Sequence, residues 1–201
     1  MQQLTLGKLD FFVVRSISTQ FIKNLFTILL SLLLLIGCAT VSYKDAISGW
    51  KSHEDVGKWL DKNFIYDSDR SRMMGKRLKK QGPSGLLVKK PEKLYKHSYG
   101  YCADAANFAI KSINAIDSNY NARWVFVFNS LGRPHHWVAA FTYQDKLYIM
   151  DYGAGPRWRS MNGVHGPYDT LEEYREYLKS LVIPAFRVGK VYFRDMPGTE
   201  D

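Results

Sequence analysis

Cysteine is scarce in this sequence: there are two among 201 residues, Cys38 and Cys102, so no disulfide framework can hold the fold together. The five histidines show no spacing typical of a metal site, and we expect neither a metal nor a cofactor. Internal repeats and low-complexity tracts are also absent. These absences leave a single globular domain as the simplest organisation.

Long hydrophobic runs are absent too, apart from one at residues 25–36. Its twelve residues are too few for a comfortable membrane span, but they suit the apolar region of a signal peptide. Three basic residues and a single acidic one precede the run, as is typical of such peptides. We therefore predict a signal peptide over residues 1–37, with an uncleaved signal anchor as the alternative.

The apolar run ends in Leu35-Ile36-Gly37-Cys38, which resembles the signal of bacterial lipoproteins. The resemblance implies that Cys38 is lipidated and becomes the mature N-terminus. Ala39 follows instead of an acid, as in the outer-membrane class of Gram-negative lipoproteins. The expected location is the bacterial cell envelope, lipid-anchored, on the outer membrane facing the periplasm if the cell is Gram-negative. Cys102 would then be a lone thiol in an oxidising compartment, which is easier to explain if it does chemistry.

Acidic residues are outnumbered in the mature chain, where 25 basic and 18 acidic residues remain after residues 1–37. The basic residues concentrate in residues 70–97, and glycines and prolines interrupt this stretch, so we predict an irregular segment. Such a run is usually a solvated surface. Its functional interpretation is contact of the 70–96 region with an anionic surface, such as phospholipid headgroups or an acidic polymer. Aromatic residues are not interleaved with these charges and export is expected, so we expect no nucleic-acid partner.

Hydrophobic periodicity predicts helices in the first half of the domain and strands in the second. The expected helices are 46–65 (with a second helix starting at His53 and capped by Ser52), 91–95, 102 onward and 170–181. The expected strands are 123–128, 135–143, 147–152 and 185–193. Short hairpins join the strands, so the fold class is α+β with an antiparallel sheet. Residues 38–45 are expected to form a tether, and residues 46–196 the domain.

Cys102 stands where a loop runs into a helix. Gly100 lets the backbone turn just before it, and Ala105, Phe108 and Ile113 line one face of the helix that follows. A thiol in the first turn of a helix lies near unpaired N–H groups and the positive end of the helix dipole, and both favour the thiolate. The interpretation is a cysteine nucleophile; a small buried structural cysteine is the alternative.

A cysteine nucleophile needs a base and a third group that orients the base. His135 and His136 begin the second expected strand, and Asp151 lies near the end of the third. Neighbouring side chains of a strand point to opposite faces, so one histidine alone can share a face with Asp151. A two-residue turn at 144–145 selects His136, and a three-residue turn selects His135. We predict a catalytic triad of Cys102, His136 and Asp151, with His135 as the alternate base.

Three motifs together resemble the transglutaminase-like superfamily: Gly100-Tyr-Cys-Ala-Asp-Ala-Ala-Asn-Phe-Ala109, His-His-Trp-Val-Ala and Leu-Tyr-Ile-Met-Asp-Tyr-Gly. The resemblance spans roughly residues 55–155. It implies a papain-like core, with the cysteine at a helix N-terminus packed on an antiparallel sheet, and a Cys-His-Asp triad in this order. The Gly-Tyr-Cys and Asp-Tyr-Gly pieces are also similar to arylamine N-acetyltransferases, whose longer N-terminal region is absent here. The family's frequent His-x-Trp pattern would point to His135, so the identity of the base stays open.

The chemistry of this superfamily is acyl transfer through a thioester, and its members include peptidases, amidases, crosslinking enzymes and inactive binding modules. The resemblance implies an envelope-anchored cysteine peptidase, amidase or acyltransferase that acts on peptide amides, with a peptide or protein as substrate. The backbone N–H of Cys102 and a group from residues 95–101 are candidates for stabilising the oxyanion. The alternative function is a catalytically inactive lipoprotein that binds a partner at the membrane through the basic 70–96 region.

Overall fold

The structure is a computed structural model that describes residues 23–24, 41–196 and 198. The expected signal peptide, apart from residues 23–24, and the expected lipidation site Cys38 lie outside these residues. The chain divides into a unit of Met1–Val41 and a unit of Ser42–Asp201, and the elements below belong to the second. Within the described residues, no helix combines the length and the hydropathy needed to cross a bilayer.

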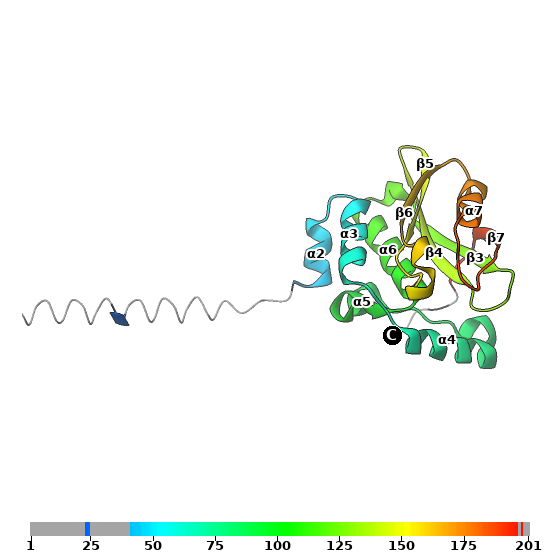
Figure 1. The fold of residues 1–201 in the computed structure, drawn as a ribbon. Coiled ribbons are helices and arrows are strands. Elements are labelled where there is room, and N and C mark those ends of the chain that lie inside the picture. The colour runs from blue at the N-terminus through cyan, green and yellow to red at the C-terminus, as the bar shows by residue number, and fades with distance from the viewer. Residues whose placement is uncertain (1–22, 25–40, 197, 199–201) are drawn as a thin grey trace, which may run out of the picture. The chain divides into compact units, whose positions relative to one another are not determined.

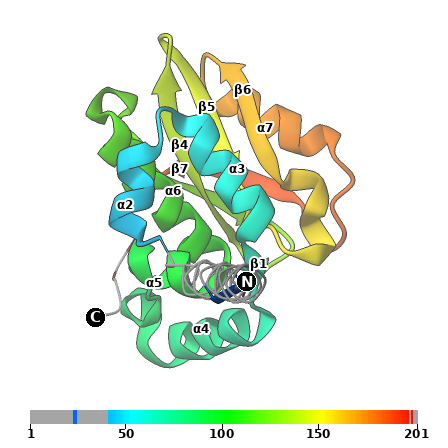
Figure 2. The same cartoon turned by 90° about the vertical axis from the view of Figure 1, so that its left-hand side faces the viewer.

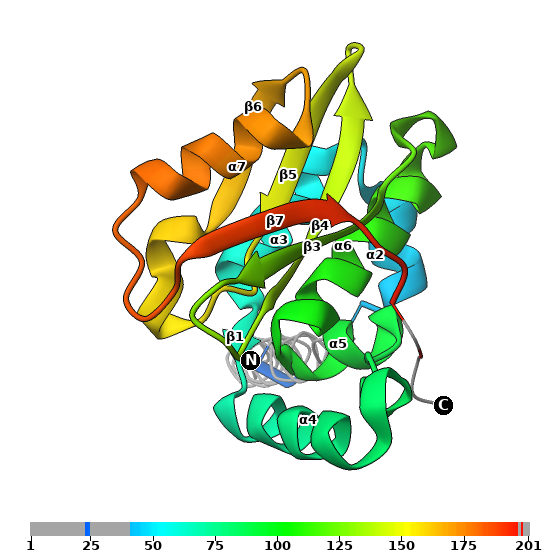
Figure 3. The same cartoon turned by 90° about the vertical axis from the view of Figure 1, so that its right-hand side faces the viewer.

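A five-stranded antiparallel sheet in the order β6-β5-β4-β3-β7 forms the centre of the domain (Figures 1 and 3). Its strands are β3 (Arg123–Asn129), β4 (His136–Tyr143), β5 (Lys146–Asp151), β6 (Gly163–Tyr168) and β7 (Val188–Phe193). The middle strand, β4, is buried on both faces from its first residue through Phe141, because helices cover the sheet on both sides. The expected α+β class with an antiparallel sheet is confirmed.

The central helix is α6 (Cys102–Ile116), which packs with α2 (Tyr43–Gly49), α3 (His53–Asn63) and α5 (Pro91–His97) on one face of the sheet (Figure 2). In this layer Phe108 of α6 shares a core with Phe141 of β4. The opposite face is covered by α7 (Leu171–Ser180), where Tyr174 packs with Ala140 of the same strand. Alternate residues of β4 therefore enter different cores.

Capping residues mark the starts of two helices, and the predicted cap Ser52 is confirmed. Ser52 caps α3, and its side chain and that of Asp55 form a capping box with the backbone. Thr170 caps α7, accepting a hydrogen bond from the N–H of Glu173. Each cap satisfies N–H groups that the first turn of a helix leaves without partners.

The prediction of an irregular segment over residues 70–97 is wrong at its start, where the chain forms α4 (Ser68–Gln81). Asp67 caps this helix by accepting from the N–H of Arg70, and Gly82, with a φ of 66°, ends it. Gly75 lies inside the helix, where a glycine costs stability without breaking the turn. Contacts with the rest of the fold, above all those of the buried Arg70, outweigh the weak local signal.

Two further elements lie where none was expected. β6 contains two glycines and Pro167, which are typical of loops; it is an edge strand paired with β5 alone, and an edge position tolerates proline. At the start of the domain in the sequence, α2 begins at Tyr43, inside the 38–45 segment that was expected to be a tether. A short 3₁₀ helix, η3 (Pro156–Met161), follows β5.

Candidate active site

Cys102 is the first residue of α6 and a free, buried cysteine with 8% of its surface exposed. A two-residue parallel pairing of β1 (Ile65–Tyr66) with β2 (Tyr99–Gly100) holds the chain just before it. Tyr101 occupies the N-cap position with an extended backbone, so the helix starts abruptly at the cysteine. The thiol therefore stands in the first turn, where the partial positive charge of the helix is greatest.

His136 and Asp151 form a buried pair at one end of the sheet. Nε2 of His136 lies 2.6 Å from Oδ2 of Asp151, and both side chains are almost completely buried. The second carboxylate oxygen accepts a hydrogen bond of 3.1 Å from the N–H of Gly153. With both oxygens engaged, the carboxylate fixes the orientation of the imidazole.

The other ring nitrogen of His136, Nδ1, is buried and has no hydrogen-bond partner within the described residues. Cys102 lies near enough to the ring to act on its pKa. Burial lowers the pKa of His136, but the charge and hydrogen bond of Asp151, followed by the hydrogen bond and charge of Cys102, outweigh burial and raise that pKa to about 10. The ring is thus paired with a carboxylate, feels the nearby thiol and favours its protonated form.

His135 faces another way. Its Nδ1 accepts a hydrogen bond of 3.2 Å from the N–H of Asn129, and its ring stacks on Phe128 with centroids 4.7 Å apart. Burial, followed by the charge of Arg133, lowers the pKa of His135. The structure therefore joins His136, and not His135, to Asp151.

The hairpin between β4 and β5 decides which histidine meets Asp151. Ala139 pairs with Met150, and this register continues down to Tyr143 and Lys146, as a two-residue turn requires. Gln144 and Asp145, the turn residues, both have positive φ, at 50° and 59°, which is the conformation of a type I′ turn. The register predicted for a two-residue turn is confirmed.

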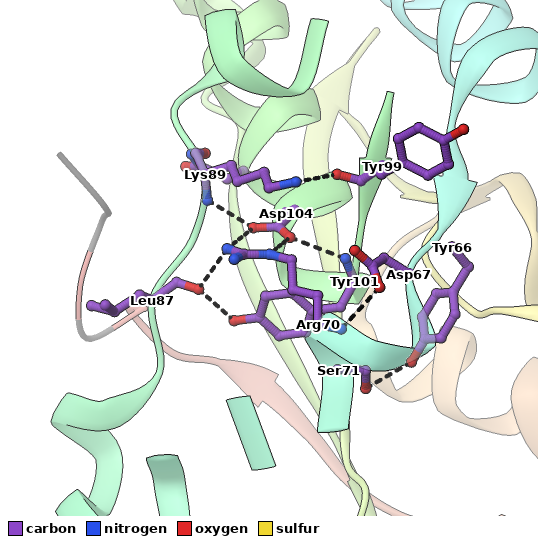
Figure 4. A network of polar contacts seen from close by, with 10 residues as sticks. Tyr66, Asp67, Arg70, Ser71, Leu87, Lys89, Tyr99, Tyr101 and Asp104 are labelled. Atoms are coloured by element: carbon purple, nitrogen blue, oxygen red, sulfur yellow. Dashed lines mark hydrogen bonds and ion pairs between the residues drawn. The ribbon is translucent and has the colours of Figure 1, made fainter. Parts of the chain in front are cut away.

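A second polar network anchors the start of α6, and sequence reasoning missed it (Figure 4). The carboxylate of Asp104, completely buried, is bound by Nε of Arg70 at 2.5 Å and by the guanidinium Nη2 at 3.0 Å. It also accepts from the backbone N–H of Lys89 at 2.7 Å and from that of Tyr101 at 3.0 Å. One carboxylate, two residues beyond Cys102, therefore ties together α4, the chain before α5 and the cysteine loop.

Arg70 was grouped with the solvated basic run, yet it is 7% exposed and paired. A signal was available in hindsight, because Asp104 interrupts an alanine-rich helix start and a buried carboxylate there needs a cation. Tyr101 adds a link of its own, since its hydroxyl donates to the carbonyl of Leu87 at 2.9 Å. Each end of this network comes from a different segment, so periodicity within one segment could not reveal it.

Gly153 brings the loop after β5 against the nucleophile. A Cβ at this position would lie 2.5 Å from Cα of Cys102 and 3.0 Å from its carbonyl oxygen. No side chain fits there, so the backbones of the two segments touch directly. Since the N–H of Gly153 also binds Asp151, this contact fixes the spacing between the cysteine and the carboxylate.

Three aromatic side chains lie near the residues of the candidate site. Trp158 of η3 meets the His136 ring edge to face, with centroids 5.9 Å apart. The Tyr174 hydroxyl is buried without a hydrogen-bond partner in the described residues; burial, followed by the charge of Asp151, raises its pKa well above 10. Burial, followed by the charge of Cys102, raises the pKa of Tyr66 to about 12. The Tyr66 hydroxyl donates to Ser71 Oγ at 2.9 Å.

In the part of the chain that the structure describes, no three histidine, cysteine or carboxylate side chains gather in a way that could hold a metal ion. A thiol at a helix start, with an imidazole and a carboxylate on neighbouring antiparallel strands, supplies the three kinds of group used by the class of enzymes that have a cysteine nucleophile.

The comparison with protein families agrees with this class. A family model described as a transglutaminase-like domain matches residues 40–158, more than half of the chain, and the chain belongs to that family. The matched stretch contains Cys102, His136 and Asp151. A comparison with curated proteins gives no match.

Proposed function

We propose that this protein is a cysteine peptidase, amidase or acyltransferase that acts on peptide amides through a thioester intermediate. The observation that carries the proposal is the buried His136–Asp151 pair at 2.6 Å, with the Cys102 thiol near enough to raise the pKa of the ring. Cys102 is the nucleophile, His136 the base and Asp151 the group that orients the base.

The reaction has two halves. In the resting site the thiol proton is already on His136, so the thiolate sulfur attacks the amide carbonyl carbon and the carbonyl oxygen acquires negative charge. The C–N bond then breaks, the imidazolium gives its proton to the departing amine, and an acyl thioester on Cys102 remains. Water or a second amine attacks the thioester, passes a proton to His136 and expels the sulfur, which restores the enzyme.

We further propose that the protein works at the bacterial cell envelope, held by a lipid on Cys38. The support is the apolar run at 25–36 that ends in Leu-Ile-Gly-Cys. An uncleaved signal anchor would hold the same part of the chain at a membrane. Either attachment leaves Ser42–Asp201 as the working domain.

The second candidate is a binding module without catalysis. It is favoured by one observation: Cys102 is only 8% exposed and His136 not at all, so a substrate must displace neighbouring groups to reach the sulfur. Thiol reactivity separates the two functions, because a thiolate–imidazolium pair reacts rapidly with alkylating reagents below neutral pH, whereas a merely packed thiol does not.

The test is the alkylation rate of Cys102 by iodoacetamide across pH, in the full chain and in three variants. We expect fast alkylation at mildly acidic pH in the wild type, a large loss with His136→Gln and a smaller one with Asp151→Asn. His135→Gln is the matched control and should leave the profile unchanged. A thiol that reacts only in unfolded protein contradicts the enzyme and supports the binding module.

A further inference from the structure

One stretch of the sequence accounts for the net positive charge of this chain. Residues 70–96 contain ten basic side chains and one acid, a net charge of +9, which equals the net charge of the whole chain. The rest of the sequence holds 18 basic and 18 acidic residues and is neutral in sum. Such a concentration creates a local field that a chain with scattered charges lacks.

Three of these basic side chains bind other groups of the fold, and the others are exposed at the surface. Arg70 is buried against Asp104, Arg77 donates to the carbonyl of Gly85, and Nζ of Lys89 donates to the carbonyl of Tyr99. The exposed ones are Arg72, Lys76, Lys79 and Lys80 on α4, with Lys90, Lys93 and Lys96 at α5. We call these seven residues the basic surface.

On α4 the exposed cations share one face. Arg72, Lys76, Lys79 and Lys80 follow one another at spacings of four, three and one, which places them along one side of a helix. Arg72 is paired with Asp69, whereas the three lysines form no ion pair with any described residue. Met73, which is 47% exposed, lies beside them. The two helices that carry the basic surface lie at the same end of the domain in all three views (Figures 1, 2 and 3).

The first helix of the domain packs against α5, one of the two helices that carry this surface. Tyr43 begins α2, and its ring packs against that of Tyr95 in α5 at 5.9 Å. Tyr43 comes five positions after Cys38, so the chain between them reaches at most about 18 Å. A membrane attachment at Cys38, or at an uncleaved anchor that ends there, therefore keeps α5 close to the headgroups.

We propose that the basic surface docks on anionic phospholipid headgroups of the membrane that holds the N-terminus, and so fixes the orientation of the domain. The inference rests on the membrane attachment in the proposed function, and it is independent of catalysis by Cys102. Lipid fits better than an acidic polymer because the short connection brings the charged face to the bilayer without a further partner. Contact with an acidic polymer becomes an outcome of the test.

The experiment is a lysine footprint of the full chain in vesicles. The protein is reconstituted in phosphatidylcholine alone and in phosphatidylcholine mixed with anionic phosphatidylglycerol, then acetylated with an amine-reactive reagent and analysed by mass spectrometry. We expect the lysines of the basic surface, Lys76, Lys79 and Lys80 on α4 with Lys90 and Lys96 at α5, to be protected several-fold in the anionic vesicles. The protection should disappear at about 1 M salt, where the screening length is about 3 Å. Lys58 of α3 and Lys179 of α7 are the unaffected references.

A matched pair of variants tests the surface as a unit. Replacing Lys76, Lys79 and Lys80 with Gln should abolish the protection of Lys90 and Lys96, and the same replacement at Lys58, Lys62 and Lys179 should not, although both variants lose three charges. The alkylation rate of Cys102 should stay unchanged in both, since none of these residues lies in the candidate active site.

Each alternative outcome overturns a defined part of the proposal. Equal acetylation in neutral and anionic vesicles contradicts lipid docking. Protection by added soluble polyglutamate, without protection by phosphatidylglycerol, replaces lipid with an acidic polymer as the partner. A full chain that does not remain with either kind of vesicle contradicts membrane attachment itself, and it leaves the thiol chemistry to be judged by the alkylation profile.

Discussion

The protonation of His136 ties the candidate site to the stability of the fold. Its pKa of about 10 in the folded protein exceeds the ordinary histidine value of 6.5. The pair with Asp151 therefore stabilises the fold fully below about pH 6.5, and this contribution is lost as the pH rises through about 10. The charge pair of the candidate site therefore also supports folding.

We predict that the free energy of unfolding falls between pH 6 and pH 10 by on the order of 1–3 kcal/mol from this pair, and that Asp151→Asn removes most of this pH dependence. Urea unfolding at a series of pH values measures it. His135→Gln serves as the control, because that ring does not contact the carboxylate. Parallel pH curves for the wild type and Asp151→Asn would show that the pair contributes nothing.

Gly153 gives a second prediction at the level of one residue. In Gly153→Ala the added methyl meets the Cys102 backbone at 2.5 Å, so one of the two segments must move, and we expect a loss of about 1–3 kcal/mol in unfolding free energy with slower alkylation of Cys102. Gly75→Ala is the matched control: nothing lies within 4 Å of that position in α4, so the variant should gain about 0.5–1 kcal/mol. Equal stability of the two variants would contradict the close contact.

Among the elements, α4 depends most on a partner distant in the sequence. Its first turn is held by the Arg70–Asp104 pair, which is buried, whereas the neighbouring Arg72–Asp69 pair is exposed. Removing one partner of a buried pair leaves an uncompensated charge, which typically costs about 3–5 kcal/mol. An exposed pair is worth about 1 kcal/mol or less.

We therefore predict that Arg70→Met lowers the unfolding free energy by about 3–5 kcal/mol and loosens α4, as measured by hydrogen exchange of its amides. Arg72→Met should cost less than about 1 kcal/mol. A double-mutant cycle with Asp104→Asn should show strong coupling to Arg70. A loss at Arg70 no larger than that at Arg72 would mean that the pair does not hold the helix.

The same elements show how far the sequence alone could go. The helix at Cys102 and the hairpin that carries His136 and Asp151 were predictable because each is encoded locally, by periodicity in one case and by turn length in the other. α4 and β6 were not, because glycine and proline argue against regular structure, and what stabilises these elements lies elsewhere in the fold. The family pattern that favoured His135 gave the wrong partner for Asp151, while side-chain alternation gave the observed one.

On the scale of the whole molecule, aromatic packing sets the N-terminal boundary of the folded domain. Tyr43 of α2 and Trp50 just after it contact the rings of Tyr95 and Phe108, at centroid distances between 5.6 and 6.4 Å. The Tyr43 hydroxyl is also 3.1 Å from Ser112 Oγ in α6. α2 therefore belongs to the folded core, and a connection to the membrane cannot include its residues without loss of packing.

We predict that a chain starting at Ser42 retains the full unfolding free energy of Ser42–Asp201, while one starting at Ser52 loses roughly 2–5 kcal/mol because the aromatic contacts of α2 are removed. Thermal and urea unfolding of the two fragments measure the difference. The double substitution Tyr43→Ala with Trp50→Ala in the longer fragment separates lost packing from shortening of the chain, and it should reproduce most of the loss. If both fragments unfold alike, α2 is dispensable, and the distance argued between α5 and a membrane attached at Cys38 has to be lengthened by the residues of that helix.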